Sequence, residues 1–272
     1  MMRTRSLSLA VLLLASALCL GLVRAEPPRG RVRLNVMSYN IHVGIGMDKK
    51  QDLKRIAEVI KSQRIDLVGL QEVDRGVERT GRVDEMKELA RLTGMDYAFA
   101  HNLDYQGGQY GVAVLSRFPI LAIDHRRYAN RRERERRGFI RVEVEVGGQR
   151  LNFVTTHLDY QWLEGRLFET EQLLKALEDV RGPLLVVGDF NEEPPGGAYE
   201  LMRKAGFADG WLRACAACAA DIKSGPTYPA DKPTKRIDYV FYRGLGDDEA
   251  ATASVPDTLA SDHRPVVVSL KF

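Results

Sequence analysis

Residues that can bind metal ions or move protons repeatedly follow short apolar runs in this sequence. Asn40 ends one such run, Glu72 a second and His157 a third, while Asp189 and Asn191 close a fourth. Side chains at the ends of several strands meet at one edge of a sheet, where they can line a concave polar site. Oxygen ligands with neutral imidazoles suit Mg2+ or Mn2+ and a phosphate, whereas zinc favours more His or Cys. The pattern therefore indicates metal-assisted chemistry on a phosphate.

Each of these residues, taken alone, also has a purely structural explanation. Asn40 could cap a turn, and Glu72 could pair with a neighbouring arginine. Asp189 and Asn191 could form the turn that precedes Pro194. It is the convergence of the whole set that favours an active site.

The segments that must position these side chains alternate between strand-like and helix-like patterns. Short runs rich in Val, Ile, Leu and aromatic residues predict strands at 32–40, 65–71, 111–116, 140–146, 151–157, 184–189, 237–242 and 266–270. Helical spacing of apolar residues predicts helices after Asp52, around Leu89 and over 167–180. A turn at Gly147 and Gly148 joins two strands directly, so the sheets should be mixed. This excludes a simple Rossmann or TIM-barrel pattern.

The composition of the 272 residues is that of an ordinary folded protein. The chain is 44% hydrophobic and 28% charged, with a mean hydropathy of -0.26, which excludes disordered and multi-span membrane proteins. No repeat, low-complexity linker or composition break follows residue 30. We therefore expect a single domain over residues 26–272.

The first 25 residues show the pattern of an export signal. Arg3 and Arg5 precede an apolar run over 7–23, and Ala25 supplies the small residue that a signal peptidase needs. A short membrane anchor is the alternative, but Pro27 and the proline after it favour cleavage. We expect residues 1–25 to be removed, no transmembrane segment to remain, and the product to be secreted or periplasmic.

Removal of this leader changes the charge of the protein. The whole chain carries +3, and residues 1–25 hold three arginines and no acid, so the mature net charge is +3 minus 3, or zero. A protein that holds nucleic acid by counterion release would carry a clear basic excess. One stretch, 126–137, contains seven arginines, but Glu133 and Glu135 interrupt it. We interpret it as a solvated loop rather than a DNA contact.

Two cysteines, Cys215 and Cys218, lie in the mature chain. Export permits a disulfide, and a single C-x-x-C without a second Cys or His pair is a weak zinc signal. No thioredoxin-like strand and helix surround the pair. The sequence therefore favours a local disulfide.

Six short motifs occur in order along the chain: SYNIH at 38–42, LQEV at 70–73, THL at 156–158, GDFN at 188–191, RIDYV at 236–240 and SDHRP at 261–265. They resemble the motifs of the endonuclease/exonuclease/phosphatase family, also called the DNase I-like superfamily, and the resemblance spans residues 33–272. It implies an α/β fold, a four-layered sandwich of two packed mixed sheets flanked by helices. It also implies cleavage of a phosphoester with one or two divalent ions, Mg2+ or Mn2+.

The resemblance further implies roles for eight residues of this chain: metal binding by Asn40, Glu72 and Asp262, activation of the attacking water by Asp189 with Asn191, phosphate contact by His157 and His263, and orientation of His263 by Asp238. These roles agree with the chemistry. In-line attack on a phosphate needs a deprotonated water and compensation for charge on the phosphoryl and leaving oxygens. A carboxylate bonded to an imidazole fixes its tautomer and raises its basicity.

Two further residues are candidates for substrate binding. Tyr110 precedes Gly111-Val112-Ala113, where many relatives carry Gly-Asn-Ala, so an Asn contact that they have is missing here. Tyr110 could equally be a packing residue. His42 opens a glycine-bearing loop, and such loops at the rim of a site often shape specificity.

The sequence leaves three functions open. We favour an exported phosphoesterase, a phosphodiesterase or phosphatase, acting on a small or lipid-linked ester. A secreted nuclease that cleaves DNA or RNA is the alternative. A non-catalytic binding protein on the same fold is the third, although such a protein would usually have lost one of the expected residues. Nothing in the sequence indicates an oligomeric state.

Overall fold

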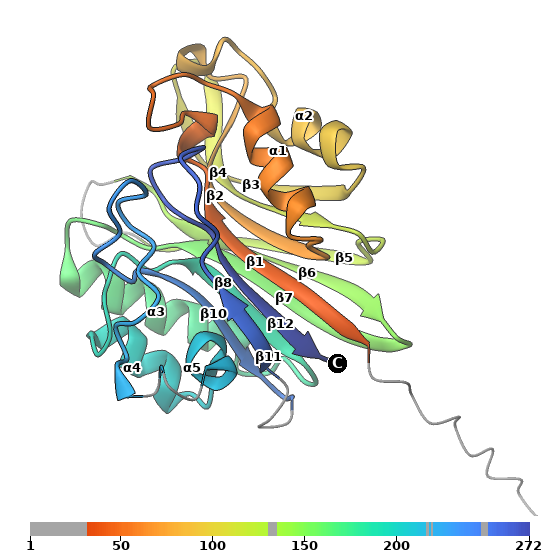
Figure 1. The fold of residues 1–272 in the computed structure, drawn as a ribbon, viewed down its shortest axis with the longest axis vertical. Helices are drawn as coiled ribbons and strands as arrows, with labels where there is room; N and C mark the ends of the chain where they lie inside the picture. The colour runs from red at the N-terminus through yellow and green to blue at the C-terminus, as the bar shows by residue number, and fades with distance from the viewer. Residues whose placement is uncertain (1–31, 130–134, 216–217, 219, 246–249) are drawn as a thin grey trace, which may run out of the picture.

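A computed structural model describes residues 32–129, 135–215, 218, 220–245 and 250–272. Its strands form two mixed six-stranded sheets (Figure 1). The first sheet has the order β11 (Ala250–Ser254), β12 (Val266–Lys271), β1 (Arg33–Asn40), β2 (Leu67–Arg75), β4 (Gly108–Ser116) and β3 (Asp96–Tyr105). The second has the order β5 (Ala122–Arg127), β6 (Gly138–Val146), β7 (Gln149–His157), β8 (Leu184–Asp189), β10 (Asp238–Arg243) and β9 (Ala208–Asp209).

Helices cover the outer face of each sheet, which gives four layers (Figure 1). The helices α1 (Leu53–Ser62) and α2 (Glu85–Thr93) pack on the first sheet, and α3 (Leu163–Leu177) and α4 (Gly197–Lys204) pack on the second. A short helix, α5 (Gly210–Ala214), follows β9. Short 3-10 turns lie at His42–Gly44 and Glu78–Thr80.

Alternation along the strands divides the apolar residues among three cores. In β1, Val36 faces the core between the sheets, whereas Met37 faces α1 and α2. In β7, Phe153 faces the same central core and Val154 faces α3. Because successive side chains of a strand point to opposite faces, nearly continuous apolar runs are needed in strands that are covered on both sides.

The two sheets approach each other closely at Gly69 in β2. A Cβ atom at this position would lie 2.2 Å from the Val187 side chain and 2.7 Å from that of Thr155, both in the opposite sheet. Two residues further along β2, Gln71 donates a hydrogen bond across the gap to Thr155 Oγ1 (2.8 Å). This close contact fixes the position of one sheet relative to the other near the carboxyl ends of β7 and β8.

The architecture confirms the predicted four-layered α/β sandwich and all eight predicted strands. Asp52 is the N-cap of α1 and accepts a hydrogen bond from the Lys54 backbone nitrogen, as the sequence indicates. The predicted disulfide between Cys215 and Cys218 is confirmed. The predicted leader, residues 1–25, lies outside the described residues. None of the helices in the described segments has the length and apolar character needed to span a membrane.

The interpretation of 126–137 as a solvated loop is wrong at both ends. Arg126 and Arg127 are exposed, as this interpretation expects, but they belong to β5, which pairs with β6, and not to a loop. Arg137 is only 4% exposed. Residues 130–134 of this stretch lie outside the described part of the chain.

Candidate active site

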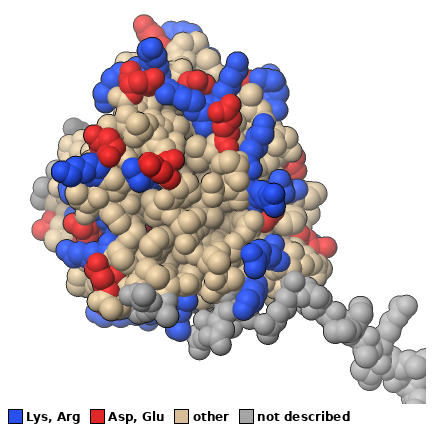
Figure 2. Space-filling view, in the orientation of Figure 1, with Lys and Arg blue, Asp and Glu red and all other residues tan. Residues whose placement is uncertain are grey.

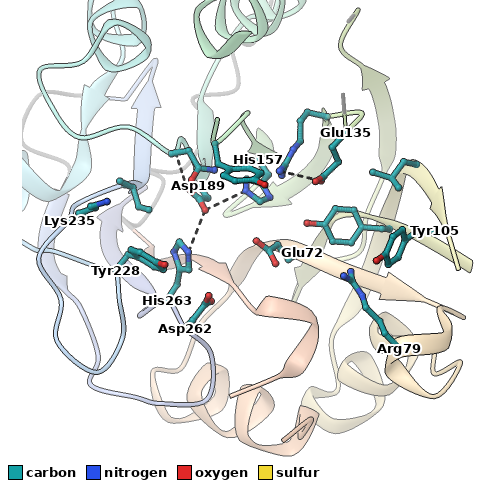
Figure 3. A pocket seen from close by; sticks show the side chains of 16 residues that line it. Glu72, Arg79, Tyr105, Glu135, His157, Asp189, Tyr228, Lys235, Asp262 and His263 are labelled. Atoms are coloured by element: carbon teal, nitrogen blue, oxygen red, sulfur yellow. Dashed lines mark hydrogen bonds and ion pairs between the residues drawn. The ribbon is translucent and has the colours of Figure 1, made fainter. Parts of the chain in front are cut away.

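A cleft of about 750 Å3 lies where the strand ends of the two sheets meet (Figure 3). In both sheets the central strands are parallel, β1 with β2 and β7 with β8, so their carboxyl ends share this edge. The strands β12 and β10 run antiparallel to β1 and β8, so their first residues lie at the same edge. Seven of the predicted residues line the cleft: Glu72, Tyr110, His157, Asp189, Asn191, Asp262 and His263.

Strand register places three of the predicted residues side by side. Asp189, the last residue of β8, is paired with His157 at the end of β7 and with Asp238 at the start of β10. The Asp189 carboxylate lies 3.5 Å from His157 Nε2 and 3.7 Å from His263 Nε2. It accepts hydrogen bonds from the Asn40 side chain (3.0 Å) and the Asn191 backbone (2.8 Å). A buried carboxylate thus faces two imidazoles.

His263 is held by a chain of hydrogen bonds that leads away from the cleft. Its Nδ1 lies 2.9 Å from Asp238 Oδ2, which also accepts a hydrogen bond from the Thr227 hydroxyl (2.5 Å). The ring of Tyr228 packs against the imidazole at a centroid distance of 4.8 Å. Asp238 is buried behind His263, so its geometry fits the predicted orienting role.

Glu72 enters the cleft because β2 is irregular at this point. The pairing of β2 with β4 shifts between Leu70 and Val73, which is a β-bulge, and Glu72 has a φ of +56°. Such bulges re-aim a side chain, and positive φ at a residue other than glycine is uncommon and concentrates at functional sites. The Glu72 carboxylate accepts a hydrogen bond from Asn40 (3.0 Å), whose side chain therefore joins Glu72 to Asp189 across the two sheets.

Asp262 lines the cleft on the loop before β12, whereas His42 does not line it. Nδ1 of His42 lies 3.8 Å from the Asp262 carboxylate and 3.1 Å from the Ile45 carbonyl oxygen. The structure thus brings His42 close to a predicted metal ligand but not into the cleft wall. Substrate contact by His42 stays a prediction.

Burial and neighbouring charges give Asp189, His263 and His157 different protonation states. Burial, and then the charge of Asp238, raise the pKa of Asp189 to about 7. Burial disfavours the charged form of His263, but the carboxylates of Asp238 and Asp189 outweigh it and raise the pKa of His263 to about 10. Burial, followed by the charges of Arg137 and His263, lowers the pKa of His157 well below its usual value. His157 is therefore neutral and His263 is an imidazolium at pH 7.

Arg137 is a cleft residue that the sequence analysis missed. Its guanidinium forms an ion pair with Glu135 (3.2 Å), and its Nε and Nη1 have no partner among the described residues. Unpartnered donors on a buried arginine are costly unless a ligand uses them. A signal was available, because β6 begins directly after Arg137 and its first residue, Gly138, is paired with His157.

The carboxylates of the cleft fit a divalent cation. Glu72 and Asp262 both line it, and no lysine or arginine of the described segments forms an ion pair with Glu72. Asp189, Asp238 and His263 also present ligand atoms that all lie within 4.8 Å of one another, and this group could hold an ion once His263 has lost its proton. Oxygen-rich donor sets of this kind suit Mg2+ or Mn2+. Asn40 uses its amide to hold two carboxylates and the His42 backbone, so its direct ligation stays a prediction.

Comparison with known proteins agrees with this geometry. Residues 37–263 match the model of the Endonuclease/Exonuclease/phosphatase family. The chain belongs to this family. Members of the endonuclease/exonuclease/phosphatase family are hydrolases that act on phosphoesters, and membership supports a phosphoester hydrolase activity for this chain.

Individual relatives cover most of the chain. The uncharacterized protein YbhP of Escherichia coli strain K12 is 27% identical over 250 residues, which cover 85% of this chain and 93% of YbhP. A solved endonuclease/exonuclease/phosphatase from Beutenbergia cavernae DSM 12333 is 26% identical, with a TM-score of 0.74, over 89% of this chain and 72% of that one. The mannosyl-6-phosphatase Bt3783 of Bacteroides thetaiotaomicron VPI-5482 is 20% identical, with a TM-score of 0.67, over 88% and 100% of the two chains. This last similarity shows the fold alone.

Proposed function

We propose that the protein is a divalent-metal-dependent phosphoesterase that hydrolyses a small or lipid-linked phosphate ester by in-line attack of water. One observation carries the proposal: the buried Asp189 carboxylate lies within 3.7 Å of two imidazoles in the same cleft as the Glu72 carboxylate. A general base, phosphate-binding imidazoles and an oxygen ligand for a cation are the parts that such hydrolysis needs.

Asp189 is the group that would accept a proton from the attacking water. Its hydrogen bonds with Asn40 and the Asn191 backbone fix the carboxylate, and a pKa of about 7 makes it a competent base near neutral pH. Its proximity to His157 and His263 places the water beside the groups that bind the phosphate.

The positive and neutral groups around Asp189 would bind the phosphoryl oxygens. His263 offers an imidazolium N–H, fixed in direction by Asp238. Arg137 offers two unpartnered nitrogens, Nε and Nη1, from a buried position. A divalent ion held by Glu72 and Asp262 would neutralise charge on the phosphoryl and leaving oxygens.

The charges of the cleft favour a compact ester over a nucleic acid. Four acids (Glu72, Glu135, Asp189 and Asp262) and four cations (Arg79, Arg137, Lys235 and the His263 imidazolium) line it. On the face shown in Figure 2, acidic and basic side chains are interspersed over the upper and left parts, and basic side chains gather along the right-hand edge of a broad uncharged area. A nuclease that tracks a polyanion would need a basic excess at the cleft itself, whose lining carries as many acids as cations.

The experiment is hydrolysis of four substrates by the purified protein, with Mg2+, with Mn2+ and with EDTA. The substrates are p-nitrophenyl phosphate, its bis ester, p-nitrophenylphosphorylcholine and supercoiled plasmid. We expect EDTA-sensitive cleavage of small esters with intact plasmid. Plasmid cleavage that falls steeply with salt would instead establish a nuclease, and metal-independent or absent hydrolysis of all four would contradict the proposal.

A further inference from the structure

The cleft continues past Glu72 into a part that the reaction itself does not use. Its walls are Arg79, Leu103, Tyr105, Tyr110 and Glu135, which we call the distal subsite. Figure 3 shows Glu72 between Asp189 on one side and Tyr105 and Arg79 on the other. In-line displacement puts the leaving group opposite the attacking water. If water is held at Asp189, the leaving alcohol extends toward the distal subsite.

The aromatic wall of the subsite is held in a fixed position. The Arg79 guanidinium lies 4.8 Å from the ring centre of Tyr105 and 5.3 Å from that of Tyr110. Arg79 is itself fixed by two hydrogen bonds of 2.8 and 2.9 Å to the carboxylate of Asp74, which is fully buried. Tyr105 remains 40% exposed. The subsite therefore offers a preformed, accessible aromatic surface to a ligand.

The polar wall of the subsite pairs an acceptor with donors. Glu135 lies 3.2 Å from Arg137, which adjoins the subsite and whose nitrogens Nε and Nη1 have no partner in the described residues. These two nitrogens carry three N–H donors, so Arg137 can donate to a phosphoryl oxygen and to a neighbouring hydroxyl at once. Adjacent carboxylate oxygens and guanidinium N–H groups can accept from one hydroxyl and donate to the next. Together with an aromatic face, this is the chemistry that binds a ring bearing several hydroxyls.

Other leaving groups fit less well. A quaternary ammonium head group would bind on the tyrosine rings, but the Arg79 cation, which lies over one face of each ring, would repel it. An acyl chain would desolvate Arg79, Glu135 and Arg137 without offering partners. Leu103 is the single aliphatic side chain among the subsite residues named above.

Resting on the proposed phosphoesterase function, we propose that the distal subsite binds a hydroxyl-rich ring, a sugar or cyclic polyol, as the leaving alcohol of the substrate. The same ring chemistry occurs in free sugar phosphates and in lipid-linked polyol head groups. Tyr105 and Glu135 are specificity-determining residues in this account, since one supplies the ring face and the other accepts from hydroxyls.

The test compares kcat/KM in Mg2+ for mannose 6-phosphate, myo-inositol 1-phosphate, p-nitrophenyl phosphate and phosphocholine, with phosphatidylinositol in mixed micelles as the lipid-linked arm. The variants are Tyr105→Ala, Tyr105→Phe and Glu135→Gln. Tyr97→Ala is the matched control, because Tyr97 is also a 40% exposed tyrosine of β3 but does not line the cleft. We expect a polyol ester to exceed p-nitrophenyl phosphate and phosphocholine at least tenfold. The polyol-to-p-nitrophenyl ratio should fall at least tenfold in Tyr105→Ala and Glu135→Gln, and stay unchanged in Tyr105→Phe and Tyr97→Ala.

The results separate this proposal from the function on which it rests. Hydrolysis of p-nitrophenyl phosphate with phosphocholine as the best substrate, or an equal loss on every ester in Tyr105→Ala, would overturn the subsite and leave the phosphoesterase intact. If no ester is cleaved, calorimetric titration of mannose 6-phosphate into the protein in EDTA decides the matter. Binding that Tyr105→Ala abolishes supports the subsite, and no binding by the unaltered protein refutes it.

Discussion

Glu85 provides a sharp test of the packing behind the active site. Its side chain is fully buried at the start of α2, where it accepts hydrogen bonds from the Asp74 backbone (2.8 Å) and from Gln51 (3.1 Å). Burial raises its pKa from the usual 4.5 to about 8. Between pH 4.5 and about pH 8, the Glu85 carboxyl therefore keeps its proton in the folded protein but has lost it in the unfolded chain.

The sign of the effect follows from this difference in bound protons. The unfolded chain releases the Glu85 proton near pH 4.5 and the folded chain only near pH 8, so the free energy of unfolding falls as pH rises through this window. A difference of about 3.5 pH units corresponds to a limiting loss of about 5 kcal/mol at about 1.4 kcal/mol per unit. Glu85→Gln removes the titration and can still accept from the Asp74 backbone. The variant should therefore gain stability over the parent by a few kcal/mol between pH 5 and pH 8.

The assay is urea unfolding followed by tryptophan fluorescence at pH 5, 6, 7 and 8, with EDTA present to remove any contribution of bound metal. Glu88→Gln is the control on the same helix, because Glu88 pairs with Arg91 at the surface and the hydrogen bond from Arg91 lowers its pKa. The control should not show the growing advantage. Parallel stability curves for the parent and Glu85→Gln across this pH range would refute the reasoning.

Four further outcomes are expected. His263→Ala should lower kcat on any cleaved ester at least 100-fold, because it removes the imidazolium beside Asp189, and should leave the circular dichroism spectrum unchanged. An unchanged kcat would contradict the phosphate-binding role of His263. Gly69→Ala should cost about 1–3 kcal/mol in urea unfolding because its Cβ would meet Val187 in the opposite sheet, and an unaltered midpoint would show that the sheets can separate freely. Arg137→Met should raise KM for all phosphate esters about tenfold or more, since it removes the unpartnered N–H donors. Expression in a bacterium with an export pathway should yield a chain that starts near Glu26 by intact mass, and an intact leader would contradict the predicted cleavage.

The sequence predicted the parts of the fold in which one physical signal dominates. Strands β7 and β8 are apolar runs that end in His157 and Asp189, and their parallel pairing then brings these residues together. Capping chemistry at Asp52 marked the start of α1 in the same way. Convergence of polar strand ends was thus enough to find the cluster of residues around Asp189, although only seven of the sixteen residues that line the cleft were predicted.

The elements that the sequence did not predict lack such a signal. In β5, at the edge of its sheet, no residue is fully buried, so charged residues such as Arg126 and Arg127 obscure the strand pattern. The bulge that turns Glu72 into the cleft depends on its pairing with β4, which no local pattern shows. In the distal subsite, Arg79 of the 3-10 turn at Glu78–Thr80 stacks on Tyr105, the last residue of β3. Contacts of this kind depend on tertiary structure and leave no periodicity to detect.

The most direct test of the proposed mechanism is a Mg2+ titration of bis-p-nitrophenyl phosphate hydrolysis by the parent protein and by Asp189→Asn. The substitution keeps the size of the side chain and removes the base that Asn40 and the Asn191 backbone hold in place. We predict saturable, EDTA-reversible activation of the parent and at least a 100-fold lower kcat for Asp189→Asn, with the urea-unfolding midpoint preserved or raised. Comparable kcat values for the two proteins at saturating Mg2+ would contradict the central role of Asp189.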